Sequence, residues 1–367
     1  MILRRYFMVE ILRGFAMIFG ALVLIYFSTR FASYLGQAAE GKIAANDIFT
    51  LISLKMLVSA KELIPLSLYL GVFATMVRMQ RDLEITIMRA SGVSHGLLIK
   101  SALLVSVTAS LVVAFVTLYA EPRAELTVEE IRERTENEAT ISGVKAGTFK
   151  EMSGGKRILY AENIAEKGDF LENTFVQSQS ASSTGIMRSN NARVETDKKT
   201  ADRFAVFRDG ISYAGSPGKL DYEITEFQKY GLRIENRTPT DLSRNVNYIP
   251  TEQLMKFHGP QYAAEIQARL GTPIATVLLP VLAILIGLTI KGGNWHVGLL
   301  TAISVYFVHN NLLGVAKSLV KKGDLHPYIG LWSIHIGLII LVTVLLIRQR
   351  RPSGLGKRPK QELLRAR

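Results

Sequence analysis

Long apolar segments alternate with one large polar stretch, and this layout restricts the chain to few folds. Three apolar segments come first, residues 121–270 are mainly polar, and three more apolar segments follow. About 20 apolar residues suffice for a helix to cross a bilayer, where every backbone polar group needs an internal partner. We therefore predict an α-helical membrane protein with six transmembrane helices and an inserted polar domain. The apolar segments are Gly14–Phe27, Ile48–Val77, Leu97–Ala120, Pro273–Ile290, Val297–Val315 and Tyr328–Ile347.

The domain boundaries follow from these segments. Residues 1–120 hold the first three helices, with a short cytoplasmic helix at 81–92. Residues 121–270 form the inserted domain and its helical flanks, and residues 271–348 hold the last three helices. The remaining residues, 349–367, form a basic tail. The first apolar segment is long and has no small-residue cleavage site, so we expect a retained helix and not a signal peptide.

The net charge of +13 is unevenly distributed along the chain. If six helices alternate in direction, most basic clusters, including the C-terminal tail, fall on the same side, as the positive-inside rule describes for cytoplasmic loops. We therefore predict that both termini are cytoplasmic and that the inserted domain lies on the outer side. The tail has no interleaved aromatic residues, which favours contact with anionic lipid over nucleic acid. The absence of cysteine excludes disulfides and thiol chemistry.

The inserted domain shows the alternation of β-strands. In one run Leu220, Tyr222 and Ile224 share a face, which is typical of a half-buried strand. Asp209-Gly210 predicts a tight hairpin between two runs. Closely spaced strands of this kind predict an antiparallel sandwich or jelly roll. The expected strands are Arg157–Ile164, Leu171–Ser178, Arg203–Phe207, Ile211–Ala214 and Leu220–Phe227, flanked by helical segments at Glu121–Ala139 and Thr251–Leu270.

Motifs of catalysis are missing from the sequence. There is no GxxxxGK[ST] phosphate loop, no GxSxG, and no histidine pair with HExxH-like spacing. We attribute the loose Ser318-x-x-Lys321 match to chance. His309 and His335 lie within predicted membrane helices, where they are either functional polar residues or packing partners of neighbouring asparagines. We predict a protein that is not an enzyme and holds neither a cofactor nor a metal.

The short helix at residues 81–92 is a candidate docking element. Leu83, Ile87 and Ala90 form an apolar stripe beside Glu84. Gly92 suits the C-terminal cap of the helix. Such a helix fits a groove on a partner, although a plain connector between two spans explains the composition equally well.

Several basic residues lie at membrane depth on the predicted outer side. Charges at this depth are costly and usually face a cavity or a partner. Taken together they suit an anionic lipid headgroup, above all a phosphate. Snorkelling to the interface is the alternative, and it is the simpler explanation for Lys321 and Lys322 taken alone. The candidates are Arg30, Lys55, Lys61, Lys317 and Lys321.

Three stretches and the overall layout resemble a known family. They are Leu63–Gly71 (LIPLSLYLG), Glu84–Gly92 (EITIMRASG) and Asp221–Tyr230 (DYEITEFQKY). Over nearly its whole length the chain resembles the lipopolysaccharide export permeases of the LptF/LptG family, and the LptF branch more closely.

The resemblance implies one permease half of an ABC exporter in the inner membrane of a Gram-negative cell. The implied partners are a second permease subunit, LptG, a dimer of a separate ATPase, LptB, that uses the ATP, and LptC on the periplasmic side. The implied substrate is lipopolysaccharide, taken from the outer leaflet. The inserted domain would be a periplasmic β-jelly roll that passes the lipid onward.

The resemblance also implies roles for particular residues. Glu84 and Arg89 would seat in a groove of the ATPase, and Arg30 and Lys317 fall where the family has cations near the lipid phosphates. Ser33 stands where we expect one more basic residue. The predicted coupling set is Asp82, Glu84, Ile87, Met88, Arg89 and Gly92, and we add Lys55, Lys61 and Lys321 to the predicted lipid ligands.

Two other classes stay open. Mechanotransmitting ABC permeases of the lipoprotein-release or division type share a similar cytoplasmic element but usually have four spans. An ion-coupled transporter or a scaffold without an ATPase would need acidic residues within its helices. Glu62 is the only acid in the six apolar segments, which argues against that class.

Overall fold

The chain divides into two compact units. The computed structural model describes residues 2–39, 43–142, 146–152, 157–164, 170–179, 184–196, 203–215, 222–233, 245–289 and 295–350. The first unit, a helix bundle, comprises Met1–Arg30, Ile52–Leu126 and Asn245–Arg367, and the second, which holds the sheet, comprises Phe31–Leu51 and Thr127–Arg244.

Except for α10, the helices are longer than the apolar segments that predict them. Within the described ranges, six helical stretches are long and apolar enough to cross a membrane, as predicted. The third is one helix in three parts, α4, a π-helical turn η2, and α5. The helices are α1 (Ile2–Ala39), α2 (Ile48–Arg81), α3 (Glu84–Ala90), α4 (His95–Phe115), η2 (Val116–Ala120), α5 (Glu121–Ser142), α7 (Thr251–Leu254), α8 (Pro260–Thr289), α9 (Trp295–Lys322) and α10 (Trp332–Arg350), with 3₁₀ turns at Ala45–Asp47 and Val246–Tyr248.

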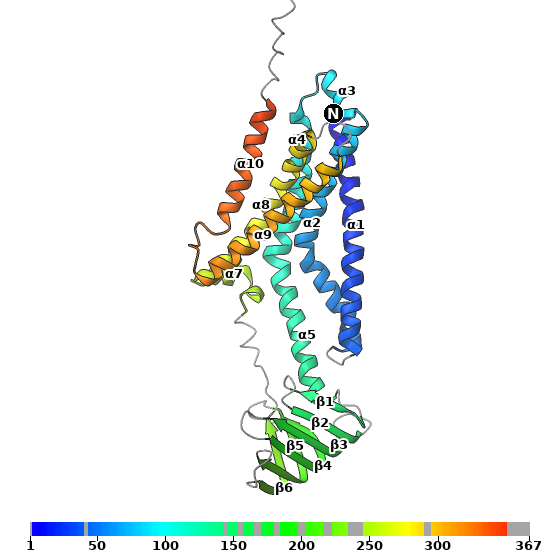
Figure 1. Ribbon diagram of the computed structural model, residues 1–367, viewed down its shortest axis with the longest axis vertical. Coiled ribbons are helices and arrows are strands. Elements are labelled where there is room, and N and C mark those ends of the chain that lie inside the picture. The colour runs from blue at the N-terminus through cyan, green and yellow to red at the C-terminus, as the bar shows by residue number, and fades with distance from the viewer. Residues whose placement is uncertain are drawn as a thin grey trace, which may run out of the picture. The chain divides into compact units, whose positions relative to one another are not determined.

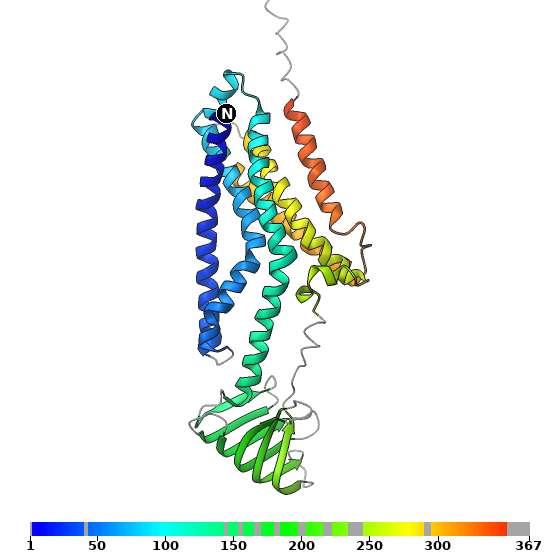
Figure 2. The same ribbon diagram turned by 180° about the vertical axis from the view of Figure 1, so that it is seen from behind.

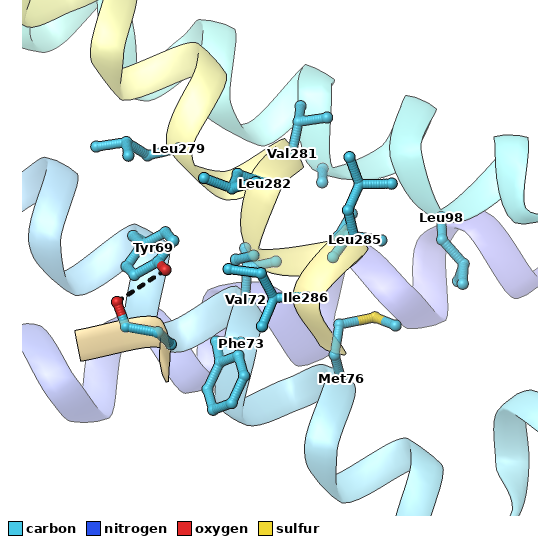
Figure 3. Packing of buried hydrophobic residues seen from close by; sticks show 14 of the residues in the cluster. Tyr69, Val72, Phe73, Met76, Leu98, Leu279, Val281, Leu282, Leu285 and Ile286 are labelled. Carbon is cyan, nitrogen blue, oxygen red and sulfur yellow. Dashed lines mark hydrogen bonds between the residues drawn. The ribbon is translucent and has the colours of Figure 1, made fainter. Parts of the chain in front are cut away.

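Helix α8 forms the centre of the bundle. It packs against α4, α9 and α10, and its apolar residues share one buried cluster with residues of α1 and α2 (Figures 1 and 2). Figure 3 shows Leu279, Leu282 and Ile286 of α8 in this cluster beside Phe73 of α2. The hydroxyl of Tyr69 donates to the carbonyl of Ala302 at 2.9 Å and so pairs a polar group inside the cluster.

Helices α1 and α2 cross at a pair of glycines. A β-carbon on Gly71 would lie 2.6 Å from the backbone nitrogen of Phe15, and one on Gly14 would lie 2.9 Å from the carbonyl oxygen of Gly71. Small residues allow two backbones to approach this closely within a membrane. Thr75 stabilises the crossing, because its hydroxyl donates to the carbonyl of Gly71 at 2.8 Å and also lies 3.2 Å from the carbonyl of Glu10.

A proline in α8 and the π-helical turn η2 fit together. Pro273 has no backbone N–H, so the carbonyl of Arg269, four residues earlier, lacks its helical partner. Thr117 lies in η2 and donates its hydroxyl to that carbonyl at 3.1 Å. In a membrane helix such side chains satisfy the backbone groups that a proline frees.

The second unit contains one antiparallel sheet with the strand order β1-β2-β3-β4-β5-β6. The strands are β1 (Phe149–Met152), β2 (Arg157–Ile164), β3 (Phe170–Gln179), β4 (Thr184–Thr196), β5 (Arg203–Gly215) and β6 (Glu223–Arg233), labelled in Figure 1. An antiparallel β-domain is therefore confirmed. A jelly roll needs Greek-key connections, whereas the described strands pair only with their neighbours in sequence, so the jelly roll stays a prediction.

Two predictions about the strands are wrong. The Asp209-Gly210 hairpin does not form, because both residues lie inside β5, which pairs with β4 and β6 on either side of them. Tyr222, just before β6, and Ile224 within it were expected on the buried face of a half-buried strand together with Leu220, but both are exposed. Leu220 lies outside the described residues. The residues of this strand that pack on the apolar cluster are Phe227 and Leu232. Strand β4 has no counterpart among the predicted strands.

A transverse line of interrupted pairs crosses the sheet from β2 to β6. Between each two neighbouring strands from β2 to β6, one pair of facing residues is not bridged, and these unbridged pairs lie side by side across the sheet. Asn173 and Asp209, on this line, have left-handed backbones with φ of 49° and 50°. In β3, β4 and β6 the residues of the apolar cluster change from odd to even numbers across this line, so both sides of the line contribute to one cluster. The omitted residues are Glu162, Asn173, Asn190, Asp209 and Gln228.

Candidate functional site

The predicted docking helix is α3, which is shorter than expected. It is bounded by two left-handed residues, Leu83 with φ of 59° and Gly92 with φ of 81°. Past its end, the N–H of Gly92 donates to the carbonyl of Arg89 and the N–H of Val93 to that of Met88. This pattern is a glycine cap at a helix C-terminus, as the sequence predicts for Gly92. The left-handed Leu83 separates α3 from α2, so that the two helices have different directions.

The side chains of α3 divide into an anchored and a free side. Ile85 is 3% exposed and belongs to the apolar cluster of the bundle, with the half-buried Met88 packed beside it. Ile87, in contrast, is 63% exposed. Large apolar residues at the surface that share one short element indicate a contact site. The exposed residues of the segment 81–92 are Arg81, Asp82, Leu83, Thr86, Ile87, Arg89, Ala90, Ser91 and Gly92.

Glu84 is bonded to two other helices of the same chain. The hydroxyl of Tyr6 in α1 donates to one of its carboxylate oxygens at 2.9 Å, and Arg78 in α2 donates to the other at 3.1 Å. Arg78 also donates to Glu10 of α1 at 2.8 Å and lies 3.5 Å from Asp82. The carboxylate that we expected in a partner's groove therefore fixes α3 to α1 and α2.

Two of the lysines predicted as lipid ligands have carboxylate partners on the helix that begins at Glu121. Lys55 of α2 donates to both oxygens of Glu125, at 2.7 and 2.9 Å. Lys61 of α2 donates to Glu121. Glu121 and Glu125 are four residues apart, hence on one face of α5. These pairs join the second and third predicted spans.

The third lysine, Lys317, takes part in a buried charged network. Its ammonium lies 2.8 Å from Oε2 of Glu265 in α8, and Oε1 of the same carboxylate accepts from Arg269 at 3.1 Å. Glu265 is 4% exposed and Arg269 is 2% exposed, whereas the Lys317 side chain is 30% exposed. Lys317 is therefore the member of the network nearest to solvent.

Arg269 also holds the segment that precedes α7. Its guanidinium donates to the carbonyls of Val246, Asn247 and Ile249 at 3.4, 3.1 and 2.9 Å, and to the hydroxyl of Thr251 at 2.9 Å. The guanidinium has five N–H donors in a rigid plane and cannot lose its charge. Its charge is balanced by Glu265, and its donors satisfy carbonyls that accept no other backbone hydrogen bond within the described part of the chain.

Known proteins are similar to this chain over all the helices and strands that carry these residues. The sequence model of the family described as "Lipopolysaccharide export system permease LptF/LptG" matches residues 5–348. The chain belongs to this family. It is 23% identical over 354 residues to the lipopolysaccharide export system permease protein LptF of Escherichia coli K12, with 94% of each chain covered. The LptF protein of Shigella flexneri matches to the same extent.

The other two lysine and arginine candidates of this LptF/LptG-family chain have no carboxylate partner in the contacts described. Arg30 lies over the ring of Tyr26 at 5.1 Å from its centroid, and the hydroxyl of Tyr26 reaches the carbonyl of Lys55 at 3.5 Å. Lys321 is exposed one helical turn after Lys317. The candidates therefore form two groups, one at α1 and α2 and one on α9. Their binding of a lipid stays a prediction.

The two membrane histidines lie together. The ring centroids of His309 in α9 and His335 in α10 are 6.0 Å apart, with the rings edge to face. Both residues are buried, and the β-carbon that any other residue would place at Gly271 of α8 would collide with His335. The pair lies where three helices meet, and both explanations for it, a functional role and packing, stay open.

The carboxylates that hold the lysines were not predicted. Glu62 is the only acid in the apolar segments, but the helices extend further and bring in Glu121, Glu125 and Glu265. The i,i+4 spacing of Glu121 with Glu125 and of Glu265 with Arg269 was a usable signal, because such residues share one helix face. The partner lysines lie on other helices, and no local pattern gives that information.

Proposed function

We propose that this chain is the LptF-type permease subunit of an ABC exporter for lipopolysaccharide. In this proposal it pairs with a second permease subunit, LptG, in the inner membrane of a Gram-negative cell. A dimer of LptB binds below and hydrolyses the ATP, since the chain has no phosphate loop of its own. Both termini are cytoplasmic, which the distribution of basic residues supports.

One observation carries the proposal beyond family membership. Leu83, just before α3, and Ile87 within it are exposed, while Glu84 beside them is bonded to Tyr6 of α1 and Arg78 of α2. An element with exposed apolar side chains for a partner and hydrogen bonds to its own bundle suits the transmission of force from that partner. Movement of the ATPase would displace α1 and α2 together with α3.

The transport step follows from the chemistry of the substrate. Acyl chains enter an apolar cavity between the paired permeases, and the lipid phosphates meet basic residues near its outer end. Closure driven by ATP hydrolysis expels the lipid toward the β-domain. We propose that this domain is periplasmic and of the jelly-roll type, that its apolar side shields the acyl chains, and that LptC takes the lipid from it.

The experiment is co-purification of the chain with LptB, followed by lipid-stimulated ATP hydrolysis. Ile87→Asp is the informative variant, because the Ile87 side chain is 63% exposed. The matched control is Ile224→Asp in β6, where the isoleucine is 62% exposed. We expect Ile87→Asp to lose the ATPase and Ile224→Asp to retain it. Equal retention by both variants would refute a docking role for α3.

The alternative classes are less well supported. A mechanotransmitting permease of the lipoprotein-release type usually has four spans, and the described part of this chain has six. An ion-coupled transporter needs an acid within the bundle that is free to bind its ion. Glu121, Glu125 and Glu265 are paired with lysines, and Glu62 is exposed on the outside of its helix.

A further inference from the structure

Glu265 has two cationic partners, Arg269 and Lys317, and only Lys317 is free enough to move away from the carboxylate. Its Oε1 accepts from Arg269 and its Oε2 lies 2.8 Å from the ammonium of Lys317. Arg269 is fixed by four further hydrogen bonds to residues 246–251. Lys317 is partly exposed, at the end of a flexible chain, and Lys321 lies one turn further along α9.

The loss of Lys317 would not leave Glu265 as an isolated buried charge. Breaking a buried ion pair is costly chiefly when one charge remains uncompensated. Here Arg269 stays beside the carboxylate, so Lys317 is able to exchange partners at a lower cost than in a simple pair. Lys61 differs, because among the described residues its ammonium is the only hydrogen-bond donor to the carboxylate of Glu121.

We propose that Glu265 is an intramolecular competitor for the anionic group that Lys317 binds, and that it sets how readily this group is released. The ligand is a phosphate group, carried by the lipid in the function proposed above, on which this inference rests. A phosphate offers more negative charge and more acceptor oxygens than a carboxylate shared with Arg269. Whether Lys317 leaves Glu265 or bridges it to the phosphate, the carboxylate charge weakens phosphate binding.

This competition serves an exporter, because a lipid held too tightly is not released. When the phosphate moves away, Glu265 is in place to take back the ammonium at 2.8 Å. The carboxylate therefore lowers the cost of separating the lysine from its ligand. Glu265 is a positioning residue that acts through Lys317 and is not itself a ligand.

The test compares lipid binding by variants of the full chain in its purified complex. Glu265→Gln keeps the shape and an acceptor for Arg269 but removes the charge. We expect it to bind lipopolysaccharide about tenfold more tightly than wild type, the range of a coupled charge pair. In a Lys317→Gln background the same substitution should have no effect. Lipid-stimulated ATP hydrolysis should show a lower KM and a lower kcat.

The control is Glu252→Gln, which neutralises one exposed carboxylate of α7 in the same unit. An equal gain of affinity in this variant would mean a general effect of net charge and would overturn the proposal. So would unchanged or weaker binding by a folded Glu265→Gln protein. A misfolded variant cannot produce the expected result, because the result is a gain.

Further measurements distinguish a failure of the proposed function from a failure of this inference, and a lipid phosphate from free phosphate. If wild type binds no lipopolysaccharide, the proposed function fails and this inference with it, whereas wild-type binding with an unaffected Glu265→Gln variant refutes the inference alone. Dephosphorylated lipopolysaccharide should show no gain in the variant, and a gain with it would overturn a phosphate ligand. If inorganic phosphate alone binds the variant more tightly than wild type, the competition holds and the site takes phosphate without the lipid.

Discussion

The hydroxyl of Thr117 donates at 3.1 Å to the carbonyl of Arg269, the carbonyl that Pro273 deprives of its helical partner. Without Thr117 this buried carbonyl would lack a hydrogen bond in the bundle interior. The π-helical turn η2 places Thr117 at the right level of α8. Single π-helical turns inside α-helices occur frequently at functional sites.

Thr117→Val should therefore destabilise the bundle. Valine has nearly the same shape but no hydroxyl, and an unsatisfied buried carbonyl costs about 1–3 kcal/mol. Thermal unfolding in detergent should show a lower midpoint. Thr108→Val is the control, because that hydroxyl is exposed and bonds only within its own helix. A Thr117→Val protein as stable as wild type would contradict a stabilising role for the hydrogen bond to the backbone carbonyl of Arg269.

Substitution at the crossing of α1 and α2 should be poorly tolerated. Gly71→Ala places its β-carbon 2.6 Å from the backbone nitrogen of Phe15, so the two helices must separate. We expect a loss of about 1–3 kcal/mol, the usual cost of overpacking. Gly20→Ala is the control in α1, because a β-carbon there meets nothing within 4 Å. Equal unfolding midpoints for both variants would contradict a close crossing.

Loss of Arg78 should separate ATPase docking from transport. Arg78→Gln removes the cation that joins the carboxylates of Glu10 and Glu84, although Glu10 keeps its ion pair with Arg13. The exposed side of α3 is unchanged. Under the proposed function, the complex with LptB should still form, and lipid-stimulated ATP hydrolysis should fall several-fold. Arg81→Gln is the matched control, because Arg81 is exposed and contacts only Asp82, at 3.6 Å. Equal loss in both variants would point to a general charge effect.

Acid titration of the β-domain should reveal a cluster around Glu195. The hydrogen bond from Lys229 lowers the pKa of this carboxyl below its usual value of 4.5, and Arg193 and Arg208 act in the same direction. Because the folded pKa is the lower one, the small contribution to stability is complete above pH 4.5 and is lost as the pH falls through the folded pKa. A ¹³C NMR titration of glutamate carboxyls measures it. Lys229→Met should raise the pKa toward 4.5, and an unchanged pKa would contradict the assigned cause.

The membrane helices could be predicted from sequence because long apolar segments have few alternatives. The β-domain was harder for an identifiable reason. Each strand from β2 to β6 carries two consecutive polar residues where the pair is omitted, such as Arg208-Asp209 and Gln228-Lys229. In a sequence, a polar doublet with glycine reads as a turn. Here the strand continues and only its side-chain faces change, so a hairpin was predicted inside β5.

The helices that carry the candidate site could be predicted from sequence, but the hydrogen bonds and ion pairs between their side chains could not. The α3 segment and its Gly92 cap follow from local sequence. The partners of Glu84 do not, because Tyr6 and Arg78 lie on other helices and α3 turns back toward them at the left-handed Leu83. The lysines were recognised as costly charges, but their cost is offset by carboxylates that lie beyond the apolar segments.

The hydrogen bonds of Arg269 imply an order in which parts of the chain fold during synthesis. The pairs of Lys55 with Glu125 and of Lys61 with Glu121 need only the first 125 residues. The carbonyls of residues 246–249, in contrast, emerge before the arginine that binds them, and the lysine that completes the network lies in α9. Because chains fold from the N-terminus as they are made, the first half acquires its ion pairs early. The segment after the β-domain is fixed only when α8 and α9 have entered the bilayer.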